Sequence, residues 1–150
     1  MGTDFMTWGT SIKNGVVYHD FALQTPQQYI QKNDRVLYGR AYHATTMMAQ
    51  GVSYATCAHY DCRNMFGTNG RLNGTINTAF REVAKDWPVM ALSYSFGTIT
   101  KTQQPIVFAV GHARDPVVEY RGPNNVIEER SLYFRTAFER TEDAVSAFSL

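Results

Sequence analysis

The sequence carries almost no net charge, contains no long apolar run and has very little cysteine. Fourteen Lys and Arg stand against thirteen Asp and Glu, which gives a formal net charge of +1 at pH 7. A domain that binds nucleic acid or an anionic membrane usually has a clear basic excess, so we expect neither partner. No apolar stretch reaches the roughly 18 residues that a membrane-spanning helix needs.

The N-terminal sequence does not indicate a cellular compartment. Its first residues lack the basic and apolar regions of a signal peptide. A cytosolic protein, a mature secreted protein and an excised fragment all fit such a start, so the compartment stays open between extracellular and cytoplasmic. Asn73-Gly74-Thr75 forms an N-glycosylation sequon, which is usable only if the chain enters the secretory pathway.

The two cysteines, Cys57 and Cys62, are separated by four residues. This spacing lets a hairpin bring two Cα atoms within disulfide range, so we expect a disulfide at a hairpin tip, with two free thiols as the alternative. A metal site would recruit His59 and Asp61 beside the two sulfurs. Zinc sites usually take ligand pairs from two separate places, and no second pair occurs. The sequence therefore predicts no metal and no cofactor.

Regular turn signals separate short segments that are rich in Val, Ile, Tyr, Phe and Thr, as is typical of strands. Asn14-Gly15 is the strongest hairpin signal among them. Further strands are expected at residues 36–44, 52–56, 89–96 and 106–110. The segment 106–110 is apolar on both faces, which favours a central strand covered on both sides.

Two segments favour helix. Residues 79–85 could form a short helical turn. Near the C-terminus an apolar stripe has helical spacing, and its members are Phe134, Phe138, Thr141, Val145 and Phe148. Thr141 followed by two acidic residues is typical of a helix start, and either one bent helix or two short helices would fit. We therefore predict a mainly β protein: a single antiparallel β-sandwich domain over residues 1–150, with a helical tail over 131–150.

Several blocks resemble the fungal glutaminase A family. They are NGRLNG at 69–74, FREVAKDWPVMAL at 80–92, VFAVGHARDP at 107–116 and SLYF at 131–134, with YHATT at 42–46 as a weaker match. They occur in the family's order, and the resemblance extends over residues 8–150. In that family an N-terminal β-sandwich region precedes a large α-helical toroid that carries the chemistry. Only the later part of the sandwich has a counterpart here, so the resemblance implies a fold and transfers no catalytic residue.

No complete catalytic constellation is visible. The four histidines are His19, His43, His59 and His112. An acid–base pair for hydrolysis or RNA cleavage is one hypothesis, with Asp20, Asp61, Asp115 or Glu119 as the partner. The alternative is that the histidines in or beside strands serve hydrogen bonding. The chain has neither a Gly-x-Ser-x-Gly elbow nor a Gly-rich phosphate loop. We predict no catalytic residue.

Aromatic residues are the more suggestive feature. Aromatic rings stack on the apolar faces of sugars while neighbouring polar groups bond the hydroxyls. The tyrosines proposed for such a platform are Tyr29, Tyr38, Tyr42, Tyr54, Tyr60 and Tyr120. Trp87, beside a proline, is expected in the core. The candidate binding residues are His59, Tyr60 and Asp61, in the expected loop between the cysteines, where burial would be difficult.

These patterns favour a non-catalytic binding domain, lectin-like, with a glycan or glycoprotein ligand. The alternative is an excised accessory domain of a larger glutaminase-type hydrolase acting on L-glutamine, inactive without its catalytic domain. A small stand-alone hydrolase or nuclease that uses histidine and aspartate is a third hypothesis. We also predict a homodimer, because half of a larger sandwich leaves an edge or an apolar face, to which the C-terminal stripe could contribute. The competing expectation is that the tail folds back onto its own sheet.

Overall fold

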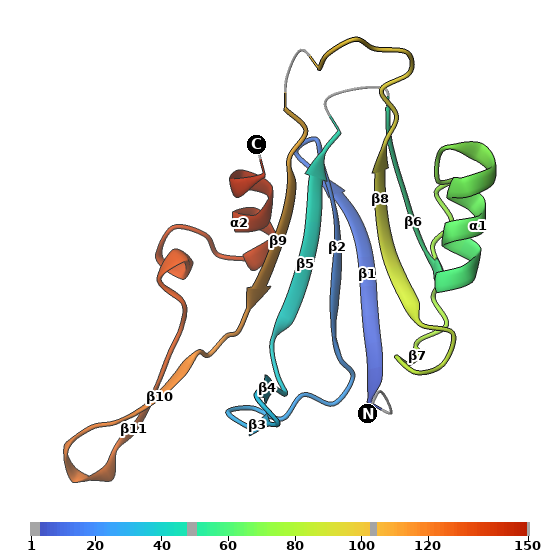
Figure 1. The fold of residues 1–150 in the computed structure, drawn as a ribbon. Coiled ribbons are helices and arrows are strands. Elements are labelled where there is room, and N and C mark those ends of the chain that lie inside the picture. The colour runs from blue at the N-terminus through green and yellow to red at the C-terminus, as the bar shows by residue number, and fades with distance from the viewer. Residues whose placement is uncertain (1–3, 48–50, 103–104, 150) are drawn as a thin grey trace.

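The structure is a computed structural model that describes residues 4–47, 51–102 and 105–149 (Figure 1). Its largest element is a five-stranded antiparallel sheet with the order β7-β1-β2-β5-β9. The strands are β1 (Phe5–Lys13), β2 (Val16–Leu23), β5 (Arg40–Thr46), β7 (Arg81–Glu82) and β9 (Phe108–Ala113). The predicted mainly β, antiparallel, sandwich-like fold is confirmed.

The β1–β2 hairpin forms where the Asn-Gly signal predicts it. Asn14 and Gly15 both have positive φ, 50° and 73°, as the two-residue turn of a tight hairpin requires. The pairing then runs without interruption from Lys13 opposite Val16 to Met6 opposite Leu23.

A second sheet consists of β6 (Val52–Ala58) and β8 (Pro88–Tyr94), paired along their whole length. One face of this two-stranded sheet packs on helix α1 (His59–Asn69) through a buried cluster of Ala55, Cys57, Cys62 and Leu72. The other face meets the large sheet, where the rings of His19 and Tyr54 lie 6.4 Å apart.

Helix α2 (Thr141–Phe148) covers the outer face of the large sheet. Val145 packs there against the buried cluster of Val16, Tyr18, Tyr42 and Ala44. The order of layers is therefore helix, large sheet, small sheet, helix, with α2 and α1 on opposite sides (Figure 1).

The remaining elements lie at the margins of this sandwich. They are the hairpins β3 (Gln31–Lys32) with β4 (Arg35–Val36) and β10 (Val118–Arg121) with β11 (Ile127–Arg130), and the 3-10 helices η1 (Pro123–Asn125) and η2 (Tyr133–Thr136). Within the described ranges, no helix is long and apolar enough to cross a bilayer.

The tail consists of two short helices, and the second begins at Thr141 as predicted. The strands expected at 52–56 and 89–96 occur as β6 and β8, whereas the one expected at 36–44 begins later, at Arg40. A strand near 106–110 exists, but its central position is wrong: β9 begins at Phe108 and forms an edge of the large sheet. Its apolar residues are not all covered, since Val110 is 80% exposed.

The expected helical turn at 79–85 is also wrong, because Arg81 and Glu82 pair with β1 instead. Arg81 is buried there, and its guanidinium lies 5.5 Å from the ring centre of Trp8. Trp87 was expected in the core, yet it is 67% exposed. The reason is local: Asp86 and Trp87 both have positive φ, so the backbone turns there and leaves the indole outside the sheet.

Candidate functional site

The segment between the two cysteines is helical and is not a hairpin tip. Cys57 belongs to β6 and Cys62 to α1, so residues 59–61 form the first turn of that helix. The predicted disulfide is present, with its Cα atoms 5.8 Å apart and both cysteines buried between the small sheet and α1. A bonded pair of sulfurs offers no thiolate ligand for a metal.

The start of α1 is tied to the turn that precedes β8. The backbone N–H of His59 donates to the carbonyl oxygens of Asp86 and Trp87, both at 3.0 Å. This contact satisfies one of the free N–H groups of the helix N-terminus, where Ala58 supplies no side-chain cap. It also brings Trp87 beside the predicted binding residues.

We call this surface the aromatic corner and define it by His59, Tyr60, Asp61, Arg63 and Trp87. Tyr60 is 77% exposed, and the ring centres of His59 and Trp87 are 6.3 Å apart. A guanidinium nitrogen of Arg63 lies 3.2 Å from Nε2 of His59, which therefore accepts the hydrogen bond. The corner offers two exposed aromatic rings, a carboxylate and a guanidinium on a backbone fixed by a disulfide.

The structure brings the three predicted binding residues together on one helical turn, and it adds Trp87 and Arg63, which sequence reasoning missed. Helix α1 itself was missed because its only buried residue is Cys62 and it shows no apolar stripe. A usable signal was Gly70, which ends the helix in the left-handed conformation at φ 64° and donates to the carbonyl of Phe66.

The wider tyrosine platform is not a single surface. Tyr38 and Tyr42 are buried. Tyr120 is exposed, but it belongs to β10, and Figure 1 shows the β10–β11 hairpin and α1 at opposite ends of the molecule. Of the proposed tyrosines, only Tyr60 belongs to the aromatic corner.

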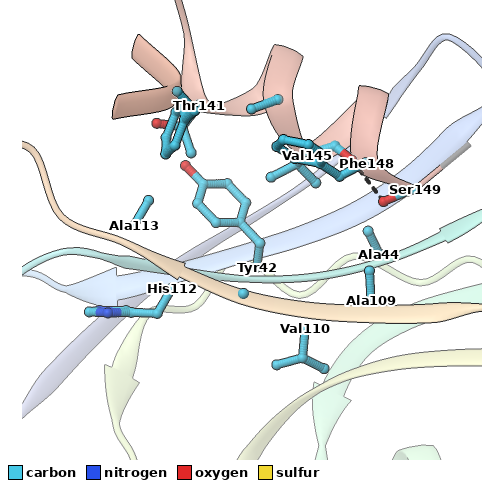
Figure 2. Close-up of a pocket in the computed structure, with 13 residues that line it drawn as sticks. Tyr42, Ala44, Ala109, Val110, His112, Ala113, Thr141, Val145, Phe148 and Ser149 are labelled. Carbon is cyan, nitrogen blue, oxygen red and sulfur yellow. Dashed lines mark hydrogen bonds between the residues drawn. The ribbon is translucent and has the colours of Figure 1, made fainter. Parts of the chain in front are cut away.

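A hollow of about 220 Å³ lies between α2 and the large sheet (Figure 2). Ala44 and Ala109 line it from the sheet, and Val145 and Phe148 from the helix. The hydroxyl of Tyr42 points toward Thr141 and donates to Glu142 at 3.2 Å. Burial, together with the neighbouring carboxylate, raises the pKa of Tyr42 above its ordinary value, so the phenol stays neutral. This arrangement ties α2 to the large sheet by one hydrogen bond beside its apolar contacts.

His19, in β2, has hydrogen-bond partners on both sides of its ring. His19 is fully buried between the sheets, with Nδ1 2.8 Å from the Thr10 hydroxyl and Nε2 3.0 Å from the Ala91 carbonyl oxygen. Because a carbonyl only accepts, Nε2 carries the hydrogen and Nδ1 accepts from Thr10. The Nε2 bond links the large sheet to β8 of the small sheet, and the Nδ1 bond joins β2 to β1 within the large sheet, so both nitrogens serve hydrogen bonding, as the alternative predicted for such a residue.

Three of the acidic residues proposed as partners form ion pairs: Asp20 with Arg40, Asp115 with Arg135 and Glu119 with Arg121. Asp61 lies on the same helical turn as His59, in the aromatic corner. Among the residues that the structure describes, no group of three or more His, Cys, Asp or Glu side chains could hold a metal ion.

The fold and its surfaces define the class of protein: an antiparallel β-sandwich domain with a helix on each outer side and an exposed aromatic corner. The chain belongs to the family described as Domain of unknown function (DUF5127), which it matches over residues 2–149.

The chain is also similar to Glutaminase A of Aspergillus oryzae (strain ATCC 42149 / RIB 40), with 32% identity over 128 residues. That match takes in 83% of this chain and 18% of the relative, so the chain spans less than a fifth of the length of that protein. The resemblance to the glutaminase A family is thereby confirmed. No solved structure matches the chain.

Proposed function

We propose that this chain is a non-catalytic accessory domain of a glutaminase A-type protein and that it docks on the remainder of that protein. The observation that carries the proposal is the uneven cover of the large sheet. The small sheet, with two strands, lies over β2, where Val17 and His19 are fully buried. Within the described ranges, the same face of β9 has no such cover.

We call the uncovered surface the open strip and define it by Phe108 and Val110 of β9 and His43 of β5. Phe108 is 46% exposed and Val110 is 80% exposed, while the ring of His43 lies 6.2 Å from that of Phe108. Figure 2 shows Val110 on the side of β9 that faces away from α2. The inner face of a sandwich is normally covered by a second sheet, and clustered exposed apolar residues are typical of an interface.

The occupant we propose is the remainder of a glutaminase A-type chain. The relative is more than five times as long as the region matched here, so it has ample chain to cover the open strip. In this proposal the catalytic groups for hydrolysis of L-glutamine lie in that remainder, and this domain supplies a docking surface.

A chimera tests the proposal. The matched region of the Aspergillus oryzae protein is replaced by this chain, and release of glutamate from L-glutamine is measured together with the melting temperature. We expect the chimera to be active, the isolated chain to be inactive, and Val110→Asp to lower both the activity and the melting temperature of the chimera.

The matched control is Val126→Asp, because Val126 is 55% exposed outside the sandwich, next to β11. In the isolated chain, diluted until it is monomeric, both substitutions should leave stability within about 0.5 kcal/mol, as is usual for exposed positions. Glutamate release by the isolated chain, or a Val110→Asp chimera as stable and active as its parent, would contradict the proposal.

A second candidate function, glycan binding, is favoured by the aromatic corner. The exposed rings of Tyr60 and Trp87 stand on backbone that is held by a disulfide and by the bonds of His59, so binding would order little further structure. A glycan array would identify a ligand, and calorimetry would then compare Tyr60→Ala and Trp87→Ala with the parent. We expect each to weaken binding at least tenfold, about 1.4 kcal/mol.

Tyr133→Ala is the matched control for the corner, since Tyr133 is also a highly exposed tyrosine and lies on η2. No binding to any glycan on the array, or full affinity in both corner variants, would rule out this second function.

A further inference from the structure

The segment that follows α1 carries a motif that neither candidate function uses. Asn73-Gly74-Thr75 is the sole Asn-x-Ser/Thr sequence in the 150 residues. From its geometry we infer that Asn73 is an acceptor site for N-linked glycan, modified at its side-chain nitrogen Nδ2. The inference is independent of docking and of the aromatic corner.

The side chain of Asn73 is presented for this chemistry. Leu72 is buried and anchors the segment, whereas Asn73 is exposed. Its Oδ1 accepts hydrogen bonds from the backbone N–H of Thr75 at 3.0 Å and from the Thr75 hydroxyl at 2.6 Å. Within the described part of the chain, no hydrogen bond uses Nδ2 of Asn73. The oxygen is therefore engaged with the third residue of the motif, and the nitrogen that becomes glycosylated is free.

The backbone around the site tolerates a large substituent. The Gly74 N–H donates to Tyr54, and the Thr75 carbonyl accepts from Thr56 at 2.8 Å, so the segment lies along β6. An added sugar on the outward side of Asn73 would break none of these bonds. A hollow of about 570 Å³ opens beside it, lined by β6 and by the chain on either side of Leu72, which leaves room for the first sugar.

The disulfide supplies the second line of support. Disulfides form and persist in oxidising compartments, and in eukaryotes the secretory pathway is the compartment where N-linked glycan is also added. The Cys57–Cys62 bond and the sequon occur within one stretch of chain, 57–75, and both call for the same environment.

The reaction is a glycosyl transfer in which the oligosaccharide comes from a lipid-linked oligosaccharide diphosphate. A bond forms between Nδ2 of Asn73 and the anomeric carbon of the first N-acetylhexosamine. The bond from that carbon to the diphosphate oxygen breaks, the lipid diphosphate leaves, and the amide loses one proton. No electron is transferred, and the catalyst is the oligosaccharyltransferase of the host.

The test is secretion of the full chain behind a cleavable signal sequence from a yeast that performs N-glycosylation. The intact mass is measured before and after treatment with a peptide-N-glycosidase, which leaves aspartate at a glycosylated asparagine. We expect a heterogeneous mass excess that the enzyme removes, with the conversion to aspartate located at residue 73.

Variants assign the site. Asn73→Gln and Thr75→Ala should both abolish the mass excess, and Thr75→Ser, which keeps a hydroxyl, should retain it. Asn64→Gln on α1 is the matched control, because Asn64 is an exposed asparagine outside any sequon, and it should be glycosylated like the parent. Non-reducing mass after alkylation confirms that each secreted variant keeps its disulfide and has folded.

A secreted, disulfide-bonded parent chain of unmodified mass would overturn the inference. So would a mass excess that survives in Asn73→Gln. Neither result bears on the docking proposal, which Val110→Asp tests in a chimera that does not depend on Asn73.

Discussion

At the scale of single residues, His19 holds the two sheets together. Burial lowers the pKa of His19 below its ordinary value near 6.5, so the folded protein keeps the ring neutral while the unfolded chain can protonate it. Stability from this residue is complete above about pH 6.5 and is lost as the pH falls toward the lower folded-state pKa.

Replacement of His19 should therefore change both the size and the pH dependence of stability. We expect His19→Gln to lose about 1–3 kcal/mol near pH 8, the usual loss when a buried hydrogen bond is broken. The difference from the parent should narrow as the pH falls toward 5. Chemical denaturation at a series of pH values measures this. Thr10→Val is the control: it removes the hydroxyl at Nδ1 but keeps the titrating ring, so the slope with pH should remain.

The disulfide allows a second prediction at this scale. The bond closes a short loop between neighbouring elements, so its loss should cost at most about 2–3 kcal/mol, because the chain-entropy contribution grows with loop length. Denaturation of Cys57→Ser/Cys62→Ser against the parent measures the loss. Alkylation of the oxidised, denatured parent should modify neither cysteine, and two alkylated cysteines without prior reduction would contradict the bond.

At the scale of elements, helix α2 divides its apolar stripe between two environments. Val145 packs on the large sheet, whereas Phe148 is 74% exposed, and its ring centre lies 5.9 Å from that of Phe138. We expect Val145→Ala to cost about 1–2 kcal/mol, from the burial of roughly two methylene groups. Phe148→Ala should cost less, about 1 kcal/mol or below, because an exposed aromatic pair contributes little more. Thermal melts of both variants show whether the loss of stability depends on the burial of the side chain or on its size.

The elements that could be predicted from the sequence are those whose signal is local. The Asn14-Gly15 hairpin and the Thr141 helix start are set by residues at the site itself, and both were found. Helix α1 was missed because the strands that it packs on come together only after folding. β6 directly precedes the helix, and β8 follows it at a distance along the chain. The predicted central position of β9 was wrong because an apolar sequence favours a covered strand, whether or not another element covers that strand in the structure.

The candidate site was predictable to the same extent. The chemistry of His59, Tyr60 and Asp61 and the proximity of the cysteines can be read from one short stretch. Trp87 lies 26 positions beyond Asp61 and joins the corner through the pairing of β8 with β6 and the hydrogen bonds of His59. No local pattern contains that contact.

At the scale of the whole molecule, the open strip has a consequence for the isolated chain. An apolar face without its proposed partner is most simply covered by a second copy, so we expect a homodimer at tens of micromolar. Light scattering coupled to size exclusion measures the mass. Val110→Asp should give a monomer and Val126→Asp should remain dimeric, while a strictly monomeric parent would contradict the prediction.

The small sheet can be widened from one side only. The outer edge of β6 is already engaged by the segment after Leu72, through the bonds of Tyr54 and Thr56 and a bridge from Thr56 to Ile76. Among the described residues, β8 pairs with β6 alone, and β5 lies in contact with β8. A strand contributed from outside would therefore bond along β8, and each strand added there would extend a roof over Phe108 and Val110.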